Sequence, residues 1–261
     1  MQLDDVTISR AITETFIKEF LDSLEVDVAV VGAGPAGMTA AYYLAKAGVK
    51  TVIYERHLKV GGGMPGGGMM FNRIVVQEEG KKLLDEFDVR AEEYVKGYYH
   101  ADSIEATSTI CSKVVKAGAK IFNLISVEDV AIRENDRITG LVLNWSATSI
   151  AGLHVDPLAT SARIVIDATG HASEVCHIVV NKIGARLRTE NGKVIGEKSM
   201  WADVAEKNIL DNTKEVYPGL VVAGMAANAV FGAPRMGPIF GGMLISGKRA
   251  AEITLDILSK K

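Results

Sequence analysis

Three glycines and one glutamate in the first quarter of the chain have the spacing of a dinucleotide-binding site. Gly32, Gly34 and Gly37 form a G-x-G-x-x-G pattern, and Glu55 follows eighteen residues after its last glycine. In this pattern the first glycine permits a tight turn, the second lets a pyrophosphate approach the backbone, and the third lets a helix pack on a strand. An acid at Glu55 can accept hydrogen bonds from ribose hydroxyls and repels a 2′-phosphate, which favours NAD or the ADP half of FAD over NADP.

The segments around these glycines predict the elements that would position a dinucleotide. Residues 26–31 and 51–54 are predicted strands, and residues 38–47 are a predicted helix between them. This β-α-β unit places the glycines at a helix N-terminus, where free N–H groups and a partial positive charge favour a phosphate. A glycine turn that binds no ligand is the alternative.

The rest of the chain predicts one α/β domain over residues 1–261, with a Rossmann-like, dinucleotide-binding fold and a mixed β excursion at about 121–160. Apolar residues at four-residue spacing predict an amphipathic helix at about 8–24, which would pack on the core or on another subunit. Further helices are expected at 76–87, 102–117 and 242–258, and further strands at 121–132, 137–145, 163–167 and 220–223, with a turn at 134–136.

Composition excludes several classes of protein. A net charge of −3 argues against a protein that binds nucleic acid by neutralising phosphates. No apolar run of about 18 residues predicts a membrane span, and the first residues do not resemble a signal peptide. Two cysteines, Cys111 and Cys176, are too few for a disulfide framework or a four-cysteine zinc site. We therefore expect a reduced, cytoplasmic protein.

Glycine makes up about a tenth of the residues, against a typical ~7%. Sixteen of the 26 glycines lie in three groups, at 32–37, 61–68 and 219–247. Clustered glycine indicates backbone that bends sharply or approaches another group closely. Three segments, rather than one, are therefore candidates for the walls of a site.

Several motifs resemble the two-dinucleotide-binding flavoproteins of the glutathione-reductase type. These motifs are Glu55-Arg56 before a second glycine loop, Ala168-Thr169-Gly170 after a strand, and Pro218-Gly219-Leu220-Val221-Val222-Ala223-Gly224 before a glycine-opened helix. Many of those flavoproteins have an aspartate after the last glycine that contacts the flavin, whereas Met225 stands here. An FAD-dependent oxidoreductase is therefore the alternative function, and a non-catalytic dinucleotide-binding module is a third.

Four segments together resemble the thiamine thiazole synthase family in its archaeal, sulfide-using form. They are Gly61-Gly62-Gly63-Met64-Pro65-Gly66-Gly67-Gly68-Met69, Leu153-His154-Val155-Asp156-Pro157, Ala168-Thr169-Gly170-His171 and Gly232-Ala233-Pro234-Arg235-Met236-Gly237-Pro238. The resemblance implies an enzyme that makes an ADP-linked thiazole carboxylate from NAD, glycine and sulfide with Fe(II). It also implies a homo-octamer whose sites are shared between adjacent subunits, with no nucleic acid and no membrane as partners.

The resemblance assigns the sulfur source and the iron ligands to particular residues. In eukaryotic members a cysteine just before a Met-Asp-Pro triplet donates its sulfur, and His154 stands at that position here. Imidazole has no sulfur to donate, so sulfide would come from outside. Asp156 and His171 match the iron ligands, a donor set that suits Fe(II) and leaves coordination sites open. The residues alone favour simpler roles: an Asp-Pro turn for Asp156 and a core or loop histidine for His171.

The resemblance also assigns the residues that would bind the organic substrates. Arg235 would clamp the glycine carboxylate, because a guanidinium matches a carboxylate bidentately; the alternative is a surface salt bridge. The residues expected around the dinucleotide are Gly32, Gly34, Ala36, Gly37 and Gly63 through their backbone, Glu55 and Arg56 at the ribose, Val127 at the adenine, Met225 near Arg235, and His154 from the next subunit.

Overall fold

The computed structural model of the chain describes residues 2–260, apart from the side chain of Glu134. A parallel sheet forms its centre, with strand order β11-β9-β1-β2-β6. Its strands are β1 (Glu25–Val31), β2 (Thr51–Glu55), β6 (Lys120–Asn123), β9 (Leu158–Asp167) and β11 (Leu220–Val222). The short strand β10 (Glu215–Tyr217) pairs antiparallel with β11. β1 therefore lies in the middle of the sheet, with β2 on one side and β9 on the other.

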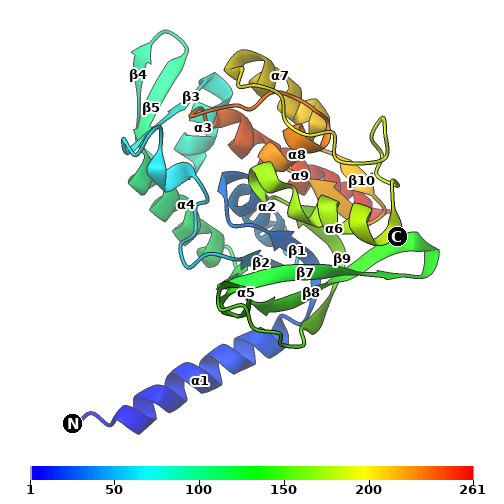
Figure 1. Cartoon of the computed structure of the whole chain (residues 1–261). Coiled ribbons are helices and arrows are strands. Elements are labelled where there is room, and N and C mark those ends of the chain that lie inside the picture. Colours follow the sequence, from blue (N-terminus) through cyan, green and yellow to red (C-terminus); the bar gives the residue numbers. More distant parts are fainter. Residues whose placement is uncertain (1, 261) are drawn as a thin grey trace.

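Two long antiparallel strands form the predicted β excursion. β7 (Ile125–Arg133) pairs with β8 (Arg137–Trp145), and β8 pairs with β9, so the excursion extends the central sheet (Figure 1). The single strand predicted at 121–132 is wrong, because it is divided between β6 and β7. Leu124 has a left-handed backbone with φ of 58°, which ends β6 and starts β7 in a new direction. The predicted turn contains a 3-10 helix, η2 (Glu134–Asp136).

Helices cover both faces of the sheet, and alternate residues of β1 belong to different cores. Val28 and Val30 pack with α2 (Pro35–Lys46), α4 (Ser103–Lys116) and α9 (Gly241–Ser259). Ala29 and Val31 pack with α6 (Glu174–Ile183) and α8 (Met225–Val230). This alternation follows from the pleat of a strand, which sends successive side chains to opposite faces. The helices predicted at 38–47, 102–117 and 242–258 are confirmed, with ends that differ by one to three residues.

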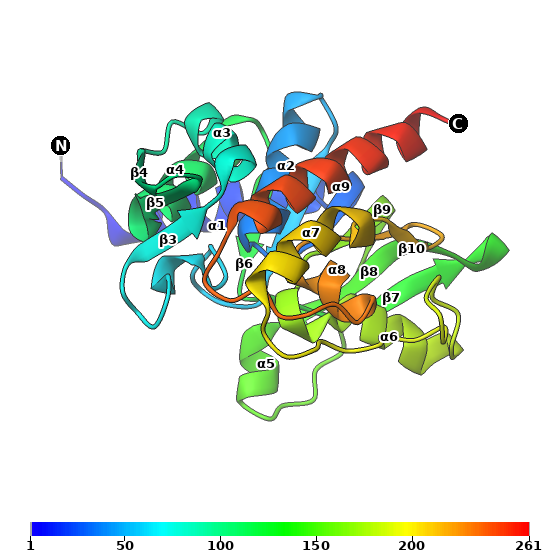
Figure 2. The same ribbon diagram turned by 90° about the horizontal axis from the view of Figure 1, so that it is seen from above.

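The close approach of α2 and α9 depends on a single glycine. Figure 2 shows α9 lying across α2 on one side of the sheet. A Cβ atom added to Gly247 of α9 would lie 2.3 Å from the carbonyl oxygen of Ala36 in α2. This distance is shorter than a carbon–oxygen contact allows, so one glycine of the 219–247 group fixes the position of the dinucleotide helix from behind.

A smaller antiparallel sheet lies beside α3 (Glu78–Glu86), the helix predicted at 76–87. Its strand order is β3 (Arg73–Val76), β5 (Tyr98–Asp102), β4 (Ala91–Val95). The β4–β5 hairpin and α7 (Ala202–Asn212) were not predicted from the sequence. β4 is largely exposed and lacks the apolar alternation by which a half-buried strand is recognised. The remaining short helices are η1 (Met64–Gly66), α5 (Ser146–Ile150) and η3 (Gly170–Ala172).

The N-terminal helix α1 (Asp5–Asp22) projects away from the rest of the molecule (Figure 1). It begins three residues earlier than predicted, because the Asp4 side chain accepts a hydrogen bond from the Thr7 N–H at 2.8 Å. Phe16 and Phe20 pack edge-on against Phe122, but no residue of the helix is buried. Most of its apolar side chains are therefore not part of this chain's core. No described helix has the length and apolar content needed to cross a membrane.

Candidate dinucleotide and substrate site

A cavity of about 650 Å³ opens beyond the carboxyl ends of β1, β2 and β9. In a parallel sheet, ligands bind at this edge, where the strand order reverses about a central strand such as β1. Most of the predicted site residues line the cavity: Gly32, Gly34, Ala36, Glu55, Arg56, Gly63, Val127, His171, Met225 and Arg235. The three glycine groups of the sequence thus contribute to one cavity.

The glycine turn after β1 has the geometry that a pyrophosphate needs. A Cβ atom at Gly32, whose φ is 100°, would lie 2.5 Å from the Ala168 carbonyl oxygen, and one at Gly37 would lie 2.0 Å from the Gly32 oxygen. Both glycines are therefore required for packing, and Gly37 lies beneath the turn rather than in the cavity. Nothing lies within 4 Å of a Cβ at Gly34, so this position leaves space at the start of α2.

Glu55 is fixed at the end of β2 by backbone donors. One carboxylate oxygen accepts the Ala33 N–H at 2.8 Å, and the other accepts the His57 N–H at 2.8 Å and faces His57 Nδ1 at 3.0 Å. The side chain is almost fully buried yet lines the cavity. Because an ionised carboxylate has about four acceptor positions, Glu55 can still accept hydrogen bonds from a ribose.

Glu174 is a cavity residue that was not predicted from the sequence. It lies in the first turn of α6 and forms an ion pair with Arg56 across the cavity. Burial raises the pKa of Glu174; Arg56 partly offsets this, whereas Asp167 and Glu55 add to it. An acid in the first turn of a helix after the Ala168-Thr169-Gly170 segment was the available signal, because such acids are stabilised by free N–H groups.

Asp167, at the end of β9, was also missed, because a buried aspartate in a strand resembles an ordinary strand end. It is fully buried and accepts hydrogen bonds from the Thr169 N–H at 3.1 Å, the Thr169 hydroxyl at 2.7 Å and the Cys176 N–H at 3.0 Å. These bonds hold the turn that leads from β9 to His171.

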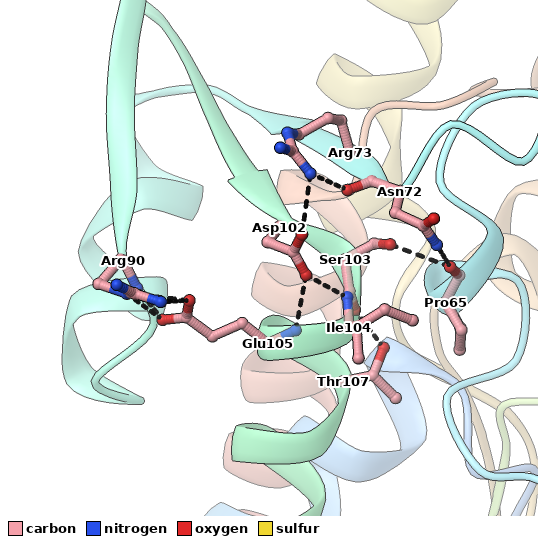
Figure 3. A network of polar contacts seen from close by, with 9 residues as sticks. All are labelled: Pro65, Asn72, Arg73, Arg90, Asp102, Ser103, Ile104, Glu105 and Thr107. Carbon is pink, nitrogen blue, oxygen red and sulfur yellow. Dashed lines mark hydrogen bonds and ion pairs between the residues drawn. The ribbon is translucent and has the colours of Figure 1, made fainter.

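The glycine loop at 61–68 forms one wall of the cavity. Its Gly61 N–H donates to the Ala33 carbonyl at 2.7 Å, which ties the loop to the dinucleotide turn. At the other end, the Pro65 carbonyl accepts hydrogen bonds from the Ser103 hydroxyl at 2.9 Å and the Asn72 amide at 3.1 Å (Figure 3). Beyond this anchor the tip is open, and Met69 is 84% exposed.

His171 and Arg235 lie on the opposite side of the cavity from this loop's anchor in the sequence, yet both line it. His171 Nδ1 lies 2.6 Å from a carboxylate oxygen of Glu197, another residue that was not predicted. Arg235 is held through its backbone, which pairs with Lys198 and Trp201 at 3.0 Å. Within the described part of the chain its guanidinium makes no hydrogen bond or ion pair, so the alternative of a surface salt bridge is not observed.

His154 and Asp156 do not line the cavity. They lie exposed in the segment 151–157 between α5 and β9, where the Asn144 amide donates to the Val155 carbonyl at 2.8 Å. Among the described residues, no three His, Cys, Asp or Glu side chains cluster closely enough to hold a metal ion. The predicted ligand pair of Asp156 and His171 is therefore not assembled within one chain.

The fold and the cavity define a dinucleotide-binding protein of the glutathione-reductase type. The same general fold occurs in a geranylgeranyl bacteriochlorophyll reductase-like protein of Thermoplasma acidophilum, with a TM-score of 0.51 and 16% identity over 90% of this chain and 79% of that one. A likeness at this level shows the fold alone.

Comparison with more similar proteins defines the family. The Thi4 family matches residues 9–240. The chain is 61% identical to the thiamine thiazole synthase of Methanothermobacter thermautotrophicus, over 99% of this chain and all of the relative, and 57% identical to that of Pyrococcus furiosus, over 99% and 98%. The crystal structure of Thermovibrio ammonificans THI4 superposes with a TM-score of 0.95 at 50% identity, over 99% of this chain and all of that one. The chain belongs to the Thi4 family.

Proposed function

We propose that this protein is a thiamine thiazole synthase that makes an ADP-linked thiazole carboxylate from NAD, glycine and sulfide with Fe(II). One observation carries the proposal: a single cavity brings together the dinucleotide turn, His171 and an unpaired Arg235, which are far apart in the sequence. The names of the relatives at 57–61% identity agree with this chemistry.

The cavity suits NAD as a substrate whose ADP half is retained. Its volume is within the range of about 300–1,000 Å³ typical of small-molecule sites. The start of α2 would hold the pyrophosphate, and Glu55 would orient the ribose. Loss of nicotinamide would then leave an ADP-bound sugar, which opens to a ketose and condenses with glycine as an imine.

Arg235 would hold glycine by its carboxylate beside that sugar. A guanidinium with no protein partner, on a loop fixed by two backbone hydrogen bonds, presents a planar fork in a fixed direction. Holding the glycine carboxylate at a fixed distance from the sugar raises the effective concentration of the amine, which is the largest contribution that a positioning residue can make.

The residues fit iron in part. His171 is at the cavity with one ring nitrogen occupied by Glu197, so Nε2 can coordinate a metal. Asp156 lies elsewhere in the same chain, so we propose that the Asp156 of a second copy completes the ligand set. Bound there, Fe(II) would supply open coordination sites and a Lewis acid for sulfide and imine chemistry.

Sulfur would enter as free sulfide. Neither cysteine lines the cavity, and burial raises the pKa of both Cys111 and Cys176, which disfavours their reactive thiolate forms. His154, at the position of the family's donor cysteine, contains no sulfur. A protein without a sacrificial thiol can turn over repeatedly.

Anaerobic incubation with NAD, glycine, Fe(II) and sulfide, followed by mass spectrometry, tests this function. We expect an ADP-thiazole product with all four components and none when any one is omitted. Absence of product with all four present would contradict the proposal. A yellow protein that releases FAD on denaturation would instead support the flavin-dependent oxidoreductase, for which the usual aspartate is replaced by Met225.

A further inference from the structure

The contact between His171 and Glu197 joins two segments that the sequence does not relate. His171 Nδ1 and the Glu197 carboxylate are 2.6 Å apart. The imidazole is 48% exposed and lines the cavity, whereas the Glu197 side chain is 19% exposed and does not line it. Glu197 therefore contacts the imidazole from behind, on the side away from the cavity.

Glu197 is held on a rigid stretch of backbone. The Gly196 N–H donates to the Ala229 carbonyl at 2.9 Å, and the Lys198 N–H donates to the Ala233 carbonyl at 3.1 Å. These bonds attach both neighbours of Glu197 to α8 and to the loop after it. Within the described part of the chain, His171 is the one side chain that the Glu197 carboxylate contacts by a hydrogen bond or ion pair.

The chemistry of this contact determines what the other ring nitrogen can do. A carboxylate accepts hydrogen bonds, so Nδ1 of His171 must carry the proton. In the neutral ring Nε2 then has a lone pair, the form in which imidazole binds a metal. Ligating histidines commonly donate their second N–H to a carboxylate in this way, which fixes both the tautomer and the orientation of the ring.

We propose that Glu197 is the positioning residue for His171: it holds the ring so that Nε2 presents its lone pair to a metal ion in the cavity. This rests on the proposed function, which makes His171 a metal ligand. Glu197 would act through His171 and would touch neither the metal nor the dinucleotide.

Metal binding to the full-length protein tests the proposal without an activity assay. Co(II) serves as the probe under anaerobic conditions, because its visible bands report coordination. We expect Glu197→Ala to weaken Co(II) binding about 10- to 100-fold, and Glu197→Gln to weaken it less, because an amide oxygen can still accept from Nδ1. Binding of 5′-ADP should remain within about twofold of wild type. Glu190→Gln, in the same connecting segment but exposed, is the matched control and should bind Co(II) like wild type.

A double variant separates positioning from direct ligation. If Glu197 acts through His171, His171→Ala with Glu197→Ala should bind Co(II) no more weakly than His171→Ala alone. A further loss in the double variant would overturn the positioning role, since it would indicate an independent ligand. Wild-type affinity in Glu197→Gln and Glu197→Ala would overturn the inference while leaving the proposed function intact.

Two further results are informative about folding and about the metal site itself. If Glu197→Ala does not fold, as judged by its melting curve and by loss of 5′-ADP binding, Glu197→Gln decides, because it keeps the side-chain volume and an acceptor. If wild type binds Co(II) no better than His171→Ala, the metal site of the proposed function fails, and the positioning role fails with it.

Discussion

The acidic residues at the adenosine end of the cavity differ in what balances their charge. Asp167 and Glu55 are held by backbone and hydroxyl donors, whereas Glu174 is paired with the guanidinium of Arg56. In dinucleotide folds an arginine near the ribose is the group that accepts a 2′-phosphate. Glu174 thus occupies the arginine that could otherwise admit NADP, and it complements the repulsion by Glu55.

Replacing Glu174 by glutamine should therefore relax the preference against a 2′-phosphate. We expect the ratio of the Kd of 2′,5′-ADP to that of 5′-ADP to fall about tenfold in Glu174→Gln, since a charge-assisted contact of about 1.5–3 kcal/mol becomes available to the phosphate. Isothermal titration calorimetry measures both constants. Glu190→Gln is the control, and an unchanged ratio in Glu174→Gln would refute this role.

The same comparison has a predictable pH dependence. The pKa of the Glu174 carboxyl is raised above its ordinary value of 4.5, mainly by burial. As the pH falls, this carboxyl is therefore neutralised earlier than an exposed glutamate and ceases to compensate Arg56. The difference between wild type and Glu174→Gln should be largest near pH 7 and should shrink as the pH is lowered toward 5, measured with the same two nucleotides.

At the position of the family's donor cysteine, a single substitution should change the source of sulfur. We expect His154→Cys, incubated with NAD, glycine and Fe(II) but no sulfide, to lose the mass of one sulfur atom from the protein and to form product once per site. Wild type under the same conditions should keep its mass and form none. Intact-protein mass spectrometry distinguishes the two, and an unchanged mass in the variant would contradict the proposed role of this position.

Among the elements, the wall formed by residues 61–68 depends on one carbonyl group. Pro65 accepts from both Ser103 and Asn72, at the junction where β5 leads into α4 (Figure 3). Ser103→Ala should lower the free energy of unfolding by about 1 kcal/mol and weaken 5′-ADP binding, because the loop becomes less ordered. Urea unfolding and calorimetry measure these effects. Ser108→Ala is the matched control, since the Ser108 hydroxyl bonds only within α4; equal effects in both variants would argue against the anchor.

The elements that the sequence predicted well are those whose pattern is determined locally. β1, α2 and β2 are confirmed because buried β-branched strands, helix-opening glycines and a following acid each indicate the same unit. The hairpin of β4 and β5 was missed because its strands are exposed and pair mainly with each other. The division at Leu124 was missed because a left-handed leucine leaves no compositional signal.

The site shows the same limit at closer range. Motif glycines, Glu55 and Arg235 are visible in the sequence, because their residue types follow from what they would bind. Glu174 and Glu197 are not, since each matters through a partner far along the chain, Arg56 and His171 respectively. Only the folded arrangement brings these pairs together.

At the scale of the whole molecule, one chain leaves two of its own surfaces unexplained. α1 carries exposed apolar side chains along most of its length, including Ile12 at 65% exposure. The segment 151–157 presents Leu153 and Val155 to solvent beside His154 and Asp156. Apolar exposure of this kind is typical of surfaces that another protein covers. A second copy of the chain on these surfaces would account both for the exposure and for the absence of Asp156 from the cavity.

Complementation between two inactive variants tests this arrangement. Asp156→Ala and His171→Ala should each abolish product formation on their own, because each removes one proposed iron ligand. If the ligands come from different copies, coexpression of the two variants should form mixed assemblies in which a site pairs an intact His171 from one chain with an intact Asp156 from its neighbour. Random mixing predicts that about a quarter of the sites are restored, the remainder lacking at least one ligand.

The measured quantity is product formed per subunit, together with Co(II) bound per subunit at a fixed concentration. Separately purified variants, mixed without subunit exchange, are the control and should remain inactive. Recovery in the coexpressed protein alone would support a shared site, because no single chain then contains both ligands. A coexpressed protein of wild-type size by light scattering that recovers neither product nor Co(II) would instead require Asp156 to reach His171 of its own chain, which in turn would require the segment 151–157 to move to the cavity.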